Sequence, residues 1–388
     1  MKKSRYLLNN TLEDLDEKMV FIGGPRQVGK TTFAKDIIGS RYNFSYYNWD
    51  NIKSRLKALN SEWNYDSELI ILDEFHKYSK WKSWIKGEYD INKEKFNFIL
   101  TGSARLNIFR RGGDSLQGRY YYYTLFPFSL TEIEGINNVI IPRDELIFKT
   151  LKHSSLNELL KFGGFPEPLL KSNDKFHRRW IMNKIDRLLN EDIRDLTLLR
   201  DIGNLLLLTE ILKTKISSIL SINSIANDLQ LNFRTVSNWI EVLENFYYCF
   251  RIPPFNKNTI KSVKKEKKLY LWDWSTIKDD GPRTENLIAV HLLKLIYFLK
   301  ETEGFDVKLF YLRDINSREV DFLITNNDDP WFSVEVKLND KKLSKNLLYF
   351  KERLKIPFNY QVVNQEGIDF VKSGIRVISL SKFLTGLI

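Results

Sequence analysis

The sequence predicts an α/β fold in several parts: a parallel sheet near the amino terminus, a helical middle, and a second α/β sheet near the carboxyl terminus. Three observations lead to this prediction. Residues 19–22 form an apolar run with the length of a buried strand and continue into a glycine-rich loop. Residues 68–74 and 96–102 are further apolar runs that end in polar residues, as buried parallel strands do. Residues 308–337 contain three stretches with strand periodicity, preceded by an amphipathic helix.

The glycine-rich loop, GPRQVGKT at residues 24–31, fits the pattern G-x-x-x-x-G-K-[ST] between a strand and a helix. Such a loop turns its backbone N–H groups onto phosphate oxygens, and a side chain at either glycine would block that approach. Lys30 is expected to reach the β- and γ-phosphates and Thr31 to bind Mg²⁺, while the helix from Thr32 adds its positive end. The alternative is a glycine-rich turn with a solvated lysine. The predicted phosphate-binding residues are Gly24, Pro25, Arg26, Gln27, Val28, Gly29, Lys30, Thr31 and Thr32.

The second apolar run, ELIILDE at residues 68–74, ends in two carboxylates that would face a nucleotide. Hydrolysis needs one carboxylate that positions the metal ion and a separate base that polarises the attacking water. Asp73 is the predicted metal-positioning residue and Glu74 the predicted base.

The third run, residues 96–102, ends beside Thr101 and Ser103, either of which would contact the γ-phosphate or the lytic water. For Ser103, a helix N-cap is an equally suitable role. Arg119 follows a segment rich in glycine and arginine and is a candidate sensor or finger for the γ-phosphate, within the chain or across a subunit interface. The alternative for Arg119 is an ion pair with a surface carboxylate.

The motifs GPRQVGKTT, LDEFHK, ILTGS, SLQGRYYYYTLFPFSLTE and GGFPE, in this order, resemble a large prokaryotic group. This group comprises the AAA-type ATPases of the AAA_14 class, joined to a carboxy-terminal DUF4143 region. The resemblance implies that Lys30, Thr31, Asp73 and Glu74 bind and hydrolyse ATP with Mg²⁺ in an ASCE-type sheet. One departure is His76, where many relatives carry Gln, and it leaves the geometry of the base open.

The middle of the chain has two helical segments. Residues 175–215 carry Leu, Ile and charges at helical spacing and suit either a lid over the nucleotide or a passive bundle. Residues 222–251 have helix-turn-helix spacing, with polar residues outward at the start of the second helix. Residues 257–268, with six Lys against one Glu, would form the wing of a winged helix, which the family resemblance also implies. The predicted nucleic-acid contacts are Arg234, Thr235, Asn238, Lys261, Lys264, Lys265, Lys267 and Lys268. Winged helices also serve as protein-contact modules, and this alternative stays open.

Near the carboxyl terminus, Asp321, Glu335 and Lys337 can converge across a hairpin. Glu285 would join them from the preceding helix, for which Thr284 is the expected N-cap. The spacing D-x₁₃-E-x-K is the pattern of a PD-(D/E)XK nuclease core, with which the family resemblance agrees. In such a core, carboxylates hold Mg²⁺ and a lysine orients or deprotonates water. The alternative is a salt-bridged ladder on a sheet surface.

The composition supports several folded domains, because 388 residues exceed what one hydrophobic core usually serves. We expect a P-loop ASCE/AAA-type domain at residues 1–165, a helical lid at 166–215, a winged helix at 216–272 and a restriction-endonuclease-like α/β domain at 273–388. Charges interrupt every apolar run and the amino terminus lacks a secretory signal, so we expect a cytoplasmic protein without a membrane partner. A single cysteine, Cys249, excludes an internal disulfide framework.

A net charge of +11 favours a polyanionic partner, for which DNA is the leading candidate. The sequence therefore predicts an ATPase that acts on nucleic acid, and it leaves metal-dependent phosphodiester cleavage open. One alternative is a nucleotide-dependent switch or protein-binding module whose nuclease-like fold is catalytically idle. Another is a plain ATPase. Whether copies of the chain form a homo-oligomer is open as well.

Overall fold

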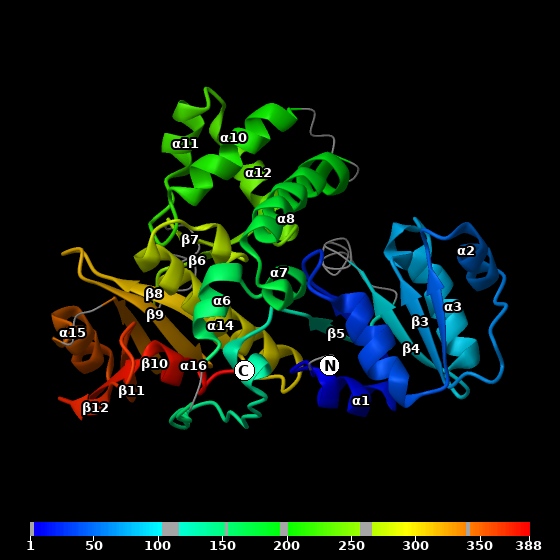
Figure 1. Cartoon of the computed structure of the whole chain (residues 1–388), viewed down its shortest axis with the longest axis horizontal. Helices are drawn as coiled ribbons and strands as arrows, with labels where there is room; N and C mark the ends of the chain where they lie inside the picture. Colours follow the sequence, from blue (N-terminus) through cyan, green and yellow to red (C-terminus); the bar gives the residue numbers. More distant parts are fainter. Residues whose placement is uncertain (1–3, 103–115, 152–153, 195–200, 257–265, 339–341) are drawn as a thin grey trace. The chain divides into compact units, whose positions relative to one another are not determined.

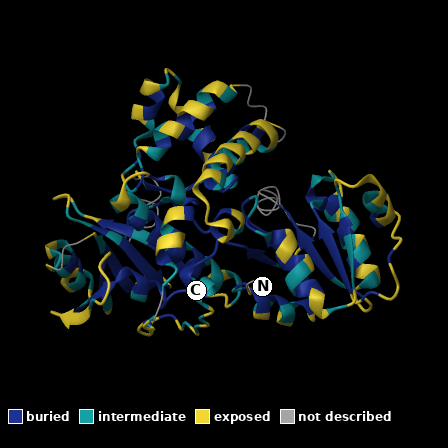
Figure 2. Ribbon diagram, viewed as in Figure 1, coloured by how far each residue is buried: buried dark blue, intermediate teal, exposed yellow. Residues whose placement is uncertain are grey.

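A computed structural model describes residues 4–102, 116–151, 154–194, 201–256, 266–338 and 342–388 (Figure 1). The chain divides into two compact units, Met1–Phe128 and Ser129–Ile388. In both units the strands are largely buried, and the helices that flank them expose their outward faces (Figure 2). In the residues that the structure describes, no helix combines the length and the apolar character needed to cross a membrane.

The first unit is built on a parallel sheet with the strand order β2-β3-β4-β1-β5. Strand β4 thus lies between β1, which leads into the glycine-rich loop, and β3, which ends at Asp73. This arrangement agrees with the P-loop fold predicted from the sequence. The strands are β1 (Met19–Gly23), β2 (Phe44–Asn48), β3 (Leu69–Asp73), β4 (Asn97–Thr101) and β5 (Tyr120–Thr124). The helical segments are α1 (Leu8–Leu15), the π-helical η1 (Thr32–Ile38), η2 (Gly39–Arg41), α2 (Ile52–Leu59), η3 (Phe75–Lys77) and α3 (Trp81–Asn92).

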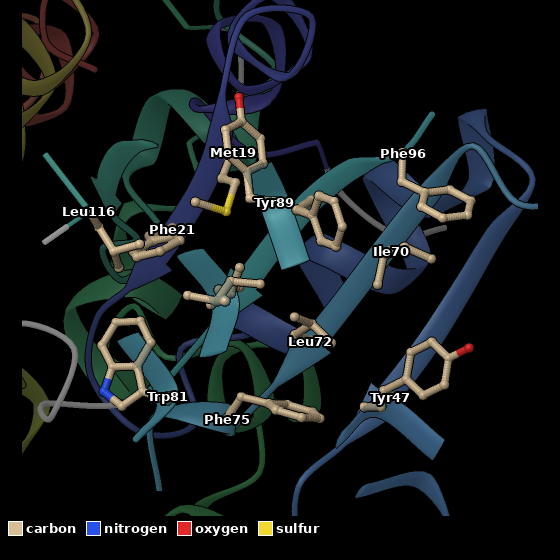
Figure 3. Close-up of a cluster of buried hydrophobic side chains, with 14 of the residues drawn as sticks. Met19, Phe21, Tyr47, Ile70, Leu72, Phe75, Trp81, Tyr89, Phe96 and Leu116 are labelled. Carbon is tan, nitrogen blue, oxygen red and sulfur yellow. The ribbon is translucent and has the colours of Figure 1, made fainter. Parts of the chain in front are cut away.

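One face of this sheet carries an aromatic core (Figure 3). Because side chains alternate along a strand, Met19 and Phe21 of β1 share this face with Ile70 and Leu72 of β3. Helix α3 covers the face with Trp81, Ile85 and Tyr89, all of them buried. Strands β1 and β3 are thus buried along their whole length, and they end at Gly23 and Asp73, beside the candidate site.

The amino-terminal part of the second unit is helical. Helices α11 and α12 are joined by a four-residue turn, in agreement with the predicted helix-turn-helix spacing, and β6 pairs antiparallel with β7. Side chains of Ser221 and Asn232 cap the amino termini of α11 and α12, respectively. The elements are α5 (Leu130–Glu134), α6 (Leu156–Phe162), α7 (Pro166–Lys171), α8 (Asp174–Arg187), η5 (Leu188–Ile193), α10 (Ile202–Lys213), α11 (Ile222–Asp228), α12 (Phe233–Asn245), β6 (Cys249–Ile252), β7 (Lys268–Leu271), η6 (Trp274–Thr276) and α14 (Asp280–Glu301).

The carboxyl-terminal part of the second unit is a mixed sheet with the order β12-β13-β11-β10-β9-β8. The hairpin between β9 and β10 turns at Asn327 and Asp328, whose φ values of 51° and 64° suit a type I′ turn. The elements are β8 (Val307–Arg313), β9 (Glu319–Asn326), β10 (Asp329–Lys337), α15 (Lys345–Leu354), β11 (Phe358–Val363), β12 (Asp369–Lys372), β13 (Ile375–Ser379) and α16 (Leu380–Leu384).

Two features differ from the sequence prediction. Helix α14 begins at Asp280, with Asp279 as its cap residue, so the prediction of Thr284 as the N-cap was wrong. A proline in the first turn costs no helical hydrogen bond, and Pro282 is therefore tolerated there. In addition, the chain after Phe128 packs within the second unit, although the sequence placed residues up to 165 with the ATPase domain. The buried Lys294 of α14 pairs with Glu132 of α5.

Candidate functional site

The glycine-rich loop after β1 has a backbone that only some residues can adopt. Gly24 has a φ of 136° and Gly29 a φ of 96°, and Gln27 between them has a φ of 63°. A Cβ atom at Gly24 would lie 2.5 Å from the carbonyl oxygen of Leu125, which is part of the backbone and cannot swing aside. The loop therefore needs glycine at position 24 for both its φ value and its close approach to Leu125.

Lys30 lies at the end of this loop, and its side chain is 7% exposed. Its ammonium group donates hydrogen bonds to the carbonyl oxygens of Gly24 at 2.9 Å and Pro25 at 2.8 Å. The lysine side chain thus folds back onto the backbone of its own loop, which is the segment that the sequence assigns to phosphate binding.

Asp73, at the carboxyl end of β3, receives hydrogen bonds from three hydroxyl groups. Thr31 donates to Oδ2 at 2.9 Å, and Tyr46 of β2 donates to the same oxygen at 2.7 Å. Thr101, at the end of β4, donates to Oδ1. The fold thus brings together Thr31 and Asp73, the two residues predicted to bind Mg²⁺.

The sequence analysis missed Tyr46. Burial and the Asp73 charge raise the pKa of its hydroxyl group, which therefore stays a donor, although a hydrogen bond from Asn48 acts in the opposite direction. The signal that could have found Tyr46 is its place in the middle of the aromatic stretch at residues 44–48, which forms β2 beside β3 in the sheet.

Glu74, the predicted base, has a left-handed backbone with φ of 61° and ψ of 14°. Non-glycine residues rarely adopt this conformation, and such strained residues cluster at functional sites. Its Oε2 lies 3.4 Å from the ammonium of Lys77 and 3.6 Å from Nε2 of His76. Burial raises the pKa of Glu74, while the charges of Lys30 and Lys77 act to lower it. His76, at the position of the departure noted above, thus lies beside this carboxylate.

Arg119 forms a two-pronged ion pair with Asp90 of α3. Its Nε donates to Oδ1 at 2.7 Å, and Nη2 donates to Oδ2 at 3.1 Å. This is the surface ion pair that the sequence left open as the alternative to a γ-phosphate contact. A role of Arg119 as sensor or finger for the γ-phosphate, within the chain or across a subunit interface, stays a prediction. Ser103 lies outside the described residues.

The residues predicted to contact nucleic acid fall into three groups. Arg234 and Asn238 are exposed on the first turns of α12, and Thr235 beside them is partly buried, with its hydroxyl donating to Asn232 at 3.0 Å. The second group consists of the lysines that precede β7, of which Lys267 is partly buried. Lys261, Lys264 and Lys265 lie outside the described residues.

Lys268 forms the third group and differs from its prediction. Its side chain is 2% exposed, and a residue so deeply buried does not contact an external phosphate in this conformation. The prediction of Lys268 as a nucleic-acid contact was therefore wrong for the described fold. Carboxylates from two other elements surround its ammonium group and explain the burial, because buried lysines are almost always paired.

The acidic cluster around Lys268 consists of Glu285, Glu319 and Asp321. The Lys268 ammonium lies 2.7 Å from Oε1 of Glu319, 3.4 Å from Oδ1 of Asp321 and 3.6 Å from Oε1 of Glu285. Tyr270, two residues further along β7, donates a hydrogen bond of 2.8 Å to Glu285. Burial and then the Asp321 charge raise the pKa of Glu285 to about 8. The sequence analysis did not predict that Glu319 belongs to this cluster.

Glu335 and Lys337 lie on β10, one strand from Asp321. Lys337 pairs with Oε1 of Glu335 at 2.8 Å, and the backbone N–H of Val336 donates to Oδ2 of Asp321 at 2.8 Å. Burial and the Asp321 charge raise the pKa of Glu335 to about 7, and its buried Oε2 lacks a hydrogen-bond partner. Oxygen donors suit Mg²⁺, and this oxygen has capacity for a further partner. Nevertheless, the described residues include no group of three or more His, Cys, Asp or Glu side chains arranged to hold a metal ion.

Comparison with known proteins yields matches along most of the chain. Residues 16–134 match a family model described as an AAA domain, residues 153–278 a domain of unknown function (DUF8612), and residues 280–383 a second domain of unknown function (DUF4143).

Two proteins of Methanocaldococcus jannaschii, both described as uncharacterized, are similar to the chain over most of its length. One is 26% identical over 404 residues, covering 97% of this chain and 88% of the relative. The other is 22% identical over 397 residues, covering 89% of this chain and 80% of the relative. The comparisons thus agree with the sequence resemblance at both ends: the amino-terminal part is similar to P-loop ATPase-type AAA domains, and the carboxyl-terminal part to DUF4143.

Proposed function

We propose that the first unit binds ATP with Mg²⁺ and hydrolyses it. The observation that carries this proposal is the 2.9 Å hydrogen bond between Thr31, directly after the P-loop lysine, and Asp73 at the end of β3. A hydroxyl and a carboxylate at the edge of a parallel sheet form the oxygen donor set that Mg²⁺ takes in P-loop sites. The positive φ values of Gly24, 136°, and Gly29, 96°, suit a loop that turns its backbone N–H groups onto phosphate oxygens.

In the proposed site each residue has one task. Lys30 exchanges its two backbone carbonyl partners for phosphate oxygens, so its positive charge is held in place before the nucleotide arrives. Thr31 and Asp73 hold Mg²⁺, whose charge offsets that of the phosphates. Glu74 accepts the proton of the attacking water, and the nearby Lys77 and His76 orient its carboxylate.

The test compares three variants of the full chain for ATP binding and turnover. We expect Lys30→Ala to abolish hydrolysis, and Glu74→Gln to keep nucleotide binding while losing turnover. Lys57→Ala is the matched control, because it removes an exposed lysine on α2 of the same unit. Normal turnover in Glu74→Gln would refute the assignment of the base.

A second candidate function is nucleic-acid binding by the start of α12. The observation that favours it is the exposure of Arg234 and Asn238 on the first turns of this capped helix, where recognition residues of helix-turn-helix proteins lie. The lysine-rich sequence between β6 and β7 would add phosphate contacts. In this proposal α11, α12, β6 and β7 form a winged helix.

Binding of duplex DNA at several salt concentrations tests this candidate. We expect Arg234→Ala to weaken binding, and Lys267→Ala, which removes one lysine of the lysine-rich sequence, to reduce the magnitude of the slope of log K against log salt by about one. Arg179→Ala is the control, because Arg179 is exposed on α8 of the same unit. DNA binding that does not respond to salt would count against phosphate contacts, and a protein that does not bind DNA at any of these salt concentrations would favour the protein-contact alternative.

A further inference from the structure

The carboxyl-terminal carboxylates already have a cation of the protein's own. The Lys268 ammonium lies within 2.7 to 3.6 Å of oxygens from Glu319, Asp321 and Glu285. Glu285 belongs to α14, whereas Glu319 and Asp321 belong to β9. A single charged group thus bridges a helix and a strand, and it does so from a third element, β7.

Each of the three carboxylates in this cluster lies beside the Lys268 ammonium, a cation that the chain itself supplies. The second oxygen of Glu319 accepts a hydrogen bond from Arg313 at 2.8 Å, and that of Asp321 accepts one from the Val336 backbone at 2.8 Å. A divalent ion would have to displace these donors from the oxygens that it needs.

The strand that carries Lys268 is fixed at several points. Tyr270 donates to Glu285 at 2.8 Å, and Asn286 of α14 bonds the backbone N–H and carbonyl of Leu271, both at 2.7 Å. The hydroxyl of Tyr311 on β8 donates to the Glu266 carbonyl at 2.9 Å. The position of Lys268 is therefore set by its neighbours on both sides, and the ammonium is not a surface group that has collapsed onto a nearby charge.

We propose that Lys268 is the resident cation of the Glu285–Glu319–Asp321 cluster and excludes a divalent metal ion from it. The carboxyl-terminal sheet in this conformation is then an ion-pair junction with β7 and not a metal-dependent nuclease centre. This inference goes beyond the proposed ATPase function and is independent of it, because the P-loop lies in the other unit.

The test titrates Mn²⁺ into the full chain without nucleotide and follows the loss of the electron paramagnetic resonance signal of free Mn²⁺. We expect wild-type protein to show no Mn²⁺ site that depends on Asp321. We expect Lys268→Met to gain one site and to lose it again when Asp321→Asn is added. An Asp321-dependent site in wild-type protein would overturn the proposal, and so would a folded Lys268→Met that gains no site.

Removing Lys268 leaves buried carboxylates without their partner, so Lys268→Met can misfold. A second variant with fewer unpaired carboxylates tests the proposal in that case. Lys268→Met/Glu319→Gln removes one positive and one negative charge together and keeps Glu285 and Asp321. We expect this variant to bind Mn²⁺ as well, and failure to bind when folded would count against the proposal.

Lys294→Met is the matched control, because Lys294 is equally buried but pairs with Glu132 outside the cluster. A site gained there would show that loosening the unit is sufficient, and it would also overturn the proposal.

Discussion

Substitution of Gly24 by alanine should damage the phosphate-binding loop through two separate physical effects. The first is conformational, because a φ of 136° costs an L-residue about 1–2 kcal/mol. The second is steric, because the new Cβ would lie 2.5 Å from the Leu125 carbonyl oxygen at the end of β5. Overpacking of this kind costs about 1–3 kcal/mol. Together, Gly24→Ala should lower the free energy of unfolding by about 2–5 kcal/mol.

Gly118 provides a control that separates the two effects. It also has a positive φ, 82°, but a Cβ atom there would have no neighbour within 4 Å. Gly118→Ala should therefore cost only the conformational part, about 1–2 kcal/mol. Replacing glycine by alanine also lowers the conformational entropy of the unfolded chain, which stabilises the folded state. This effect is the same in both variants and cancels when they are compared.

Urea unfolding followed by tryptophan fluorescence measures both variants, and titration with a fluorescent ATP analogue measures nucleotide binding. We expect Gly24→Ala to be the less stable variant and to lose nucleotide binding, while Gly118→Ala binds normally. Equal destabilisation of the two variants would refute the steric reasoning. Normal nucleotide binding in Gly24→Ala would show that the loop does not need its close approach to Leu125.

Two further predictions concern charged groups. Burial lowers the pKa of His291 from 6.5 to about 4, so its contribution to stability is present above pH 6.5 and is lost as the pH falls through 4. The free energies of unfolding of wild type and His291→Gln should diverge by up to about 3 kcal/mol as the pH falls across this interval. Parallel plots of the free energy of unfolding against pH would contradict the lowered pKa. For Arg119, we expect Asp90→Asn to leave ATP turnover unchanged and to lower the free energy of unfolding only slightly, because exposed ion pairs contribute little to stability. A large loss of turnover in Asp90→Asn would show that the ion pair positions Arg119 for catalysis.

Local sequence patterns were sufficient to predict most of the fold. The apolar run before the glycine-rich loop became β1, and the three stretches with strand periodicity near the carboxyl terminus became β8, β9 and β10. These predictions succeeded because the periodicity of a strand and the glycine needs of a loop are properties of neighbouring residues. The pairing of Thr31 with Asp73 followed in turn, since carboxyl ends of adjacent parallel strands share one edge of a sheet.

The remaining features depend on contacts between residues that lie far apart in the sequence. A lysine at the end of a lysine-rich run is ordinarily solvated, and the burial of Lys268 depends on carboxylates that follow more than a dozen residues later, in α14 and β9. Arg119 shows the same limit, because its partner Asp90 lies on α3 and the residues around Arg119 in the sequence give no sign of the pairing. In both cases residue type predicted the charge correctly, whereas the partner was set by tertiary packing.

Calorimetric titration of the wild-type full chain with Mg-ATP tests the proposed function most directly. We expect heat from one binding site per chain, and none when Lys30→Ala is titrated under the same conditions. Wild-type protein that unfolds cooperatively but gives no heat with Mg-ATP at any practical concentration would contradict nucleotide binding by the loop between β1 and η1.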